Sequence, residues 1–87
     1  MTIIFTRHAR LRQKQRKISG KTIIEALEKP DVISEDKTGN PLIGKRINHH
    51  AIIVVYKNRK EKRIIVTVYK TSYQRLKKLK AVIKGKL

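Results

Sequence analysis

His8, Arg12 and Arg16 have the types and the spacing that chemistry on a phosphodiester requires. They follow one another at intervals of four residues, so a helix would place them on one side, about one turn apart. An imidazole can accept or donate a proton near neutral pH, and a planar guanidinium can hold a phosphate through two hydrogen bonds. The pattern predicts a proton-transfer centre with a phosphate clamp, and a solvated helix face is the alternative interpretation.

Two hydroxyl side chains, Thr67 and Tyr69, form a second candidate group near the end of the chain. They lie in an apolar segment, residues 63–70, that has the composition of a strand. Strict alternation along a strand puts Thr67 and Tyr69 on one face together with Ile65, and Val68 on the other. On an open face the pair could orient a substrate, and Tyr69 could stack on a base. Both residue types are also ordinary in strands, so a purely structural role stays open.

The adjacent pair His49 and His50 resembles a metal site only in composition. Neighbouring side chains of an extended segment point in opposite directions, so the two rings cannot readily bind one ion. The chain has no cysteine, and its 6 acidic residues are dispersed through the middle of the sequence. We therefore expect neither a metal nor another cofactor. One of the two histidines lining a substrate groove stays an open alternative.

The net charge indicates the class of partner. The chain has 87 residues, with 23 Lys and Arg against 6 Asp and Glu, and a formal net charge of +17. Residues 1–24 and 62–87 contain no acid, so a positive field must persist over much of the surface. The favoured partner is a phosphate polymer; an acidic protein, or a lysine-rich surface adapted to heat, is the alternative. The further candidate phosphate contacts are Arg7, Arg10, Arg16, Lys45, Arg46, Lys70, Arg75 and Lys78.

The length of the chain allows one small domain, spanning residues 1–87. No apolar run approaches the roughly 18 residues that a membrane span needs. No leader with a charged, an apolar and a small-residue region opens the chain. We therefore expect a soluble, cytoplasmic protein without a membrane partner.

Local patterns predict helices at the front of the chain and a sheet behind them. Thr6 and Ser19 have side chains suited to capping two helices, and Pro30 stops the second one. Turn residues at 38–41 and a polar link at 58–61 join neighbouring strands. A frayed basic tail is the alternative to the last helix. In chain order, the expected elements are a strand at 2–5, helices at 7–17 and 20–29, strands at 31–37, 42–48, 51–57 and 63–70, and a basic helix at 72–83.

The order of these short motifs over residues 3–71 resembles a specific family. The motifs are His8-Ala9, Arg12, Arg16 and Ile18, then a short capped helix, Pro30, a hairpin, and two apolar strands that end in Tyr56 and Tyr69. This order is similar to a domain-of-unknown-function group with an HAxxR start and a VxTVY final strand, among the RelE/ParE-like toxins. The resemblance implies an α+β fold of β-α-α-β-β-β-β order, with two N-terminal helices packed on a mostly antiparallel sheet. The basic helical extension, residues 72–87, departs from it.

The resemblance also implies a function of the toxin type. It implies either metal-independent cleavage of RNA or, in the ParE branch, binding and poisoning of DNA gyrase, with a small acidic antitoxin as partner. Together with the residue chemistry it predicts an endoribonuclease that cleaves RNA, free or on the ribosome, by attack of the 2′-OH. His8 would act as base or acid, Arg12 would hold the phosphate, and Thr67 and Tyr69 would orient the substrate. A module that binds nucleic acid without cleaving it is the alternative.

Overall fold

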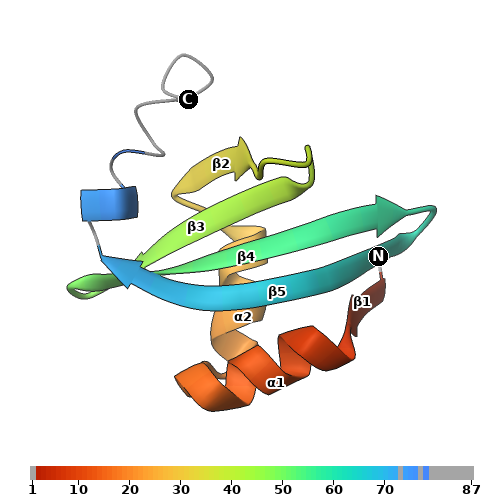
Figure 1. The fold of residues 1–87 in the computed structure, drawn as a ribbon, viewed down its shortest axis with the longest axis horizontal. Coiled ribbons are helices and arrows are strands. Elements are labelled where there is room, and N and C mark those ends of the chain that lie inside the picture. The colour runs from red at the N-terminus through yellow and green to blue at the C-terminus, as the bar shows by residue number, and fades with distance from the viewer. Residues whose placement is uncertain (1, 73, 77, 79–87) are drawn as a thin grey trace.

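Strands and helices follow each other in the expected order, which confirms the α+β prediction. The computed structural model describes residues 2–72, 74–76 and 78. In chain order the elements are β1 (Thr2–Phe5), α1 (Arg7–Arg16), α2 (Gly20–Glu28), β2 (Val32–Glu35), β3 (Pro41–Ile47), β4 (His50–Arg59) and β5 (Lys62–Ser72) (Figure 1). Within this part of the chain, no helix has the length and apolar character to cross a membrane.

The strands form one sheet in the order β1-β5-β4-β3-β2. The first and last strands of the described residues are neighbours, because β1 pairs in parallel with the start of β5. The remaining pairs, β2 with β3, β3 with β4 and β4 with β5, are antiparallel. The mostly antiparallel sheet that we expected is therefore confirmed, and β4 lies at its centre between β5 and β3.

Both predicted caps hold the helices as expected. The Thr6 hydroxyl accepts a hydrogen bond from the backbone N–H of Ala9 at 3.0 Å and donates one to the carbonyl of Val66 at 3.2 Å, so the start of α1 is tied to β5. The Ser19 hydroxyl accepts the N–H of Thr22 at 3.1 Å. Between the helices Lys17 adopts a left-handed conformation, with φ of 54°, which ends α1. The chain can then turn directly into α2.

The sheet has an apolar cluster on each side. Both helices cover one side, which we call the helical face (Figure 1). Its buried residues are Ala9, Ile18, Ile23, Ala26, Ile43, Ile52, Val54, Tyr56, Ile65 and Val68. The other side, the opposite face, has its own cluster of Val32, Leu42, Ala51, Ile53, Val55 and Leu76. Because both faces carry apolar residues, β4 is apolar at consecutive positions, as its sequence indicated.

A β-bulge in β5 changes which side chains share a face. Val55 pairs with Thr67, but the next residue of β4, Tyr56, pairs with Ile65. Val66 is therefore an extra residue in β5, and alternation is interrupted there. As a result Ile65 and Val68 both belong to the helical face. The expectation that Ile65 shares a face with Thr67 and Tyr69 is wrong, since it assumed an uninterrupted strand.

The C-terminal helix begins later than predicted, because β5 continues through Ser72. Residues 74–76 and 78 are helical, and the Ser72 hydroxyl accepts the N–H of Arg75 at 3.2 Å. Leu76 is 2% exposed and packs on the opposite face. The rest of the expected helix, at residues 73, 77 and 79–83, lies outside the described residues.

Gly44 allows Leu76 to pack against the sheet. A Cβ at this position would lie 2.5 Å from Cδ1 of Leu76 and 3.1 Å from Cδ1 of Ile53. We predict that Gly44→Ala lowers the free energy of unfolding by about 1–3 kcal/mol, the usual cost of overpacking. In a Leu76→Ala background the same change should cost clearly less, because the nearest atom is gone. Urea denaturation of the double-mutant cycle measures this difference. Equal costs in the two backgrounds would contradict the assigned contact.

Candidate nucleic-acid interface

The sheet separates the four residues that the sequence analysis grouped into a catalytic centre. His8 is exposed on α1, and Arg12, half-buried on the same helix, donates to Oε1 of Gln15 at 3.3 Å. Helix α1 packs on the helical face through Ala9. Thr67 and Tyr69 pair with β4 residues of the opposite-face cluster, and residues paired across antiparallel strands share a face. The structure therefore does not bring the two pairs together.

Tyr69 has the surroundings of a neutral phenol. Its side chain is 37% exposed. Partial burial of the ring raises its pKa; Arg75 opposes this shift and the charge of Asp36 adds to it. A raised pKa keeps the hydroxyl protonated near neutral pH, so Tyr69 can donate a hydrogen bond or offer a ring face but is a poor base.

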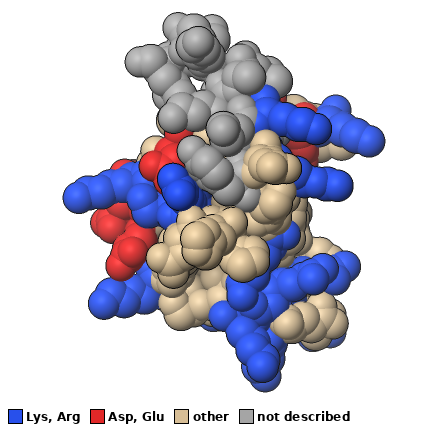
Figure 2. All heavy atoms as spheres, turned by 90° about the vertical axis from the view of Figure 1, so that its left-hand side faces the viewer, with Lys and Arg blue, Asp and Glu red and all other residues tan. Residues whose placement is uncertain are grey.

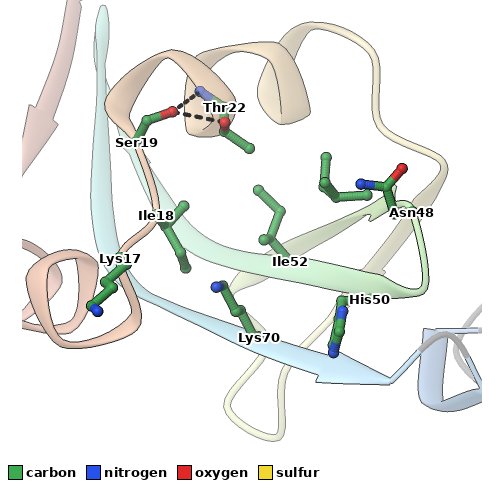
Figure 3. Close-up of a pocket in the computed structure, with 9 residues that line it drawn as sticks. Lys17, Ile18, Ser19, Thr22, Asn48, His50, Ile52 and Lys70 are labelled. Carbon is green, nitrogen blue, oxygen red and sulfur yellow. Dashed lines mark hydrogen bonds between the residues drawn. The ribbon is translucent and has the colours of Figure 1, made fainter.

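A hollow on the helical face lies between the turn that joins α1 to α2, the start of β4 and the end of β5. It has a volume of about 320 Å³. Its floor is apolar and consists of Ile18, Ile47 and Ile52. Its polar lining residues are Lys17, Ser19, Thr22, Asn48, His50 and Lys70 (Figure 3). In Figure 3 the Lys70 side chain extends from β5 towards Ile18 and Ile52.

A second hollow adjoins the first and shares part of its wall. It has a volume of about 410 Å³ and runs along the last turns of α1. The shared residues are Lys17, Ile18 and Ser19, and the additional lining residues are Arg10, Gln13 and Lys14. We call the two hollows together the basic groove.

The local sequence explains why the basic groove forms. The left-handed turn at Lys17 brings the chain from α1 to the Ser19 cap and leaves the Lys17 side chain exposed. Asn48, with φ of 56°, makes the tight turn between β3 and β4. Lys70 pairs with Ile52, a residue of the helical-face cluster. Its side chain therefore emerges beside the groove on this face.

The lining of the basic groove is strongly positive. It contains Arg10, Lys14, Lys17 and Lys70, and neither hollow has an Asp or Glu in its lining. Figure 2, which views this end of the molecule, shows Lys and Arg side chains projecting on several sides of an uncharged patch, with Asp and Glu at its margins. Concentrated positive charge in a concave site raises the local concentration of anionic ligands.

Arg10 is held in place before any ligand binds. Its guanidinium carbon lies 4.2 Å from the centre of the Phe5 ring, and its Nη1 donates to Oε1 of Gln13 at 3.4 Å. A guanidinium stacked on one ring keeps its other side available to stack on a base. The predicted contact Arg10 is therefore pre-positioned at the edge of the groove.

The other predicted phosphate contacts are divided over the molecule. Arg7 and Arg16 are exposed on α1. Lys45 donates from Nζ to the carbonyl of Lys29 at 2.9 Å, which links β3 to the end of α2. Arg46 pairs with a residue of the opposite face and donates from Nε to the carbonyl of Asn48 at 3.0 Å. The last two candidates, Arg75 and Lys78, are exposed in the C-terminal helical segment.

Two lysines of the groove, Lys14 and Lys17, were not singled out by the sequence analysis. Each is one basic residue among many in an acid-free region, so composition gives no reason to prefer it. His50 was an open alternative as a groove residue, and the structure places it in the groove lining. The N-cap type of Ser19 favours an end of the first helix just before Ser19, which locates the turn at Lys17 but does not place its side chain in a groove.

The described residues contain no group of three or more His, Asp or Glu residues placed to hold a metal ion.

The comparisons with known proteins give one family. Residues 5–70 match the model of the family described as Domain of unknown function (DUF4258). The chain belongs to this family. No curated protein and no solved structure matches the chain.

Proposed function

We propose that this protein binds single-stranded RNA in the basic groove. The observation that carries the proposal is the pair of adjoining hollows lined by four cations and no acid. A volume of about 320 Å³ is near the lower end of the range for small-molecule sites, roughly 300–1,000 Å³. Such a hollow takes one nucleotide unit rather than a duplex, which favours a single strand.

The lining residues suit the separate parts of a nucleotide. Lys17 and Lys70 are exposed cations that can contact phosphates. The apolar floor, with the Arg10 guanidinium nearby, suits the face of a base. Hydroxyl and amide side chains of the groove can bond a 2′-OH, the group that distinguishes RNA from DNA. These hydroxyls belong to Ser19 and Thr22, whose oxygen atoms lie 2.7 Å apart.

Neutralising the groove should weaken RNA binding and its dependence on salt. For Lys17→Gln with Lys70→Gln we expect the affinity for a uridine oligomer to fall at least about tenfold, as two phosphate contacts are lost. The slope of log K against log salt should fall by about 1.4, at roughly 0.7 for each contact to a single strand. Fluorescence anisotropy over a series of salt concentrations measures both quantities.

The matched control is Lys29→Gln with Lys37→Gln, which removes the same charge at exposed positions away from the groove. This variant should bind within about twofold of the unchanged protein if location rather than net charge decides affinity. Equal losses in the two variants would reject the groove as the site.

Metal-independent cleavage of the bound RNA is the second candidate function. The observation that favours it is His50, an imidazole in the same hollow as Lys17 and Lys70. In this reaction a base takes the 2′-OH proton and the 2′-oxygen attacks phosphorus. The bond to the 5′-oxygen breaks, an acid supplies that oxygen with a proton, and a 2′,3′-cyclic phosphate remains. His50 fills one proton-transfer role and water the other, while the lysines stabilise the charge of the phosphorane.

The cleavage test compares two exposed histidines. RNA incubated in EDTA with the unchanged protein should yield 2′,3′-cyclic phosphate ends. His50→Ala should slow cleavage by about 10²–10⁴-fold, the usual contribution of a general acid or base, while binding is kept. His8→Ala, outside the groove, serves as the control and should cleave normally. Absence of products from the unchanged protein, or equal loss in both variants, would leave RNA binding as the function.

A further inference from the structure

We infer that the far end of the β4–β5 hairpin is a second contact for the backbone of the RNA held in the basic groove. This inference rests on the proposed RNA binding and extends its footprint. We call residues 57–63 the hairpin arm. Its ligand is the phosphate backbone, without preference for base sequence.

The hairpin arm extends past β3 on one side of the sheet. On one side, β3 pairs with β4 only as far as Val55, so the outer edge of β4 beyond that residue has no strand partner among the described residues. On the other side, β1 pairs with the start of β5. Figure 1 shows the β4–β5 turn at the opposite end of the sheet from the turn between β3 and β4, which borders the groove.

The arm carries cations that the fold does not use. Lys57, Arg59, Lys60 and Lys62 are exposed, and within the described part of the chain none of them forms an ion pair. The arm has a single acid, Glu61. An exposed cluster of one sign is the electrostatic footprint of a phosphate-binding surface.

The arm is built as a stiff support for these cations. The Arg63 guanidinium carbon lies 4.5 Å from the centre of the Tyr56 ring, and its Nε donates to Oδ1 of Asn58 at 3.4 Å. The N–H of Thr2 donates to the carbonyl of Glu61 at 3.0 Å. These contacts hold the hairpin in place, so that mainly the exposed cation side chains have to be ordered when they meet phosphates.

The distance between the arm and the groove predicts that short and long oligomers differ in their dependence on the arm. Lys62 of the arm and Lys70 of the groove are eight positions apart on β5, which corresponds to roughly 26 Å at about 3.3 Å per residue. A short oligomer can therefore occupy only one of the two surfaces. Lys57 follows Tyr56 of the helical face, and Lys62 pairs with Arg59, so alternation directs both side chains to the opposite face. Only a longer strand that passes over the end of the hairpin can contact both surfaces, and only its affinity should depend on the arm.

The experiment compares uridine oligomers of about 4 and about 16 nucleotides, the limits of typical single-strand site sizes. The arm variant is Lys57→Gln with Lys60→Gln, and the charge-matched control is Lys29→Gln with Lys37→Gln. We expect the arm variant to lose at least about tenfold in affinity for the long oligomer, with a salt slope smaller by about 1.4. Its affinity for the short oligomer, and both affinities of the control, should change by less than about twofold.

The outcomes separate the arm from the groove. If the long oligomer binds the arm variant as well as it binds the unchanged protein, or if both oligomers weaken equally, the inference is overturned. The arm cations then act only as edge charges that oppose aggregation. If the unchanged protein binds neither oligomer, the proposed function fails and the inference fails with it.

Discussion

The antiparallel pairing of β4 with β5 is the interaction on which the rest of the molecule depends. Residues Ala51 to Tyr56 of β4 are all at most 9% exposed, and each large apolar side chain among them contributes about 1.5–3 kcal/mol on burial. Alternate side chains enter the two clusters, so this one strand joins the helical face to the opposite face. The same pairing sets Lys70 beside the groove at one end and Lys62 in the arm at the other.

The bulge at Val66 has the largest consequence for function. It keeps Ile65 and Val68 together on the helical face and leaves Thr67 and Tyr69 on the other side of the sheet from α1. A hydroxyl pair and a His–Arg helix face that look complementary in the sequence are thereby separated. The groove instead combines the end of α1 with the start of β4 and the end of β5, which are far apart along the chain.

The elements were predictable from the sequence because their boundaries are local. Thr6 and Ser19 cap the helices, Pro30 follows α2, and the turn after β2 has the residues that a turn requires. The site was less predictable, since a bulge leaves no mark on composition and shifts every side chain beyond it to the other face. Lys17 lines the groove because α1 packs against β5. This tertiary contact leaves no local pattern in the sequence, so Lys17 could not be selected from the many basic residues.

The most direct test of the account maps the amide NMR signals that shift when a uridine oligomer is added to the full chain. If RNA binds in the groove, the largest shifts occur in residues 17–22 and 48–50 and at Lys70. The amides of Thr67 and Tyr69, whose side chains lie on the opposite face, should move little. Large shifts at Thr67 and Tyr69, without shifts at the groove residues, would contradict binding in the groove. They would place the RNA site on the opposite face of the sheet.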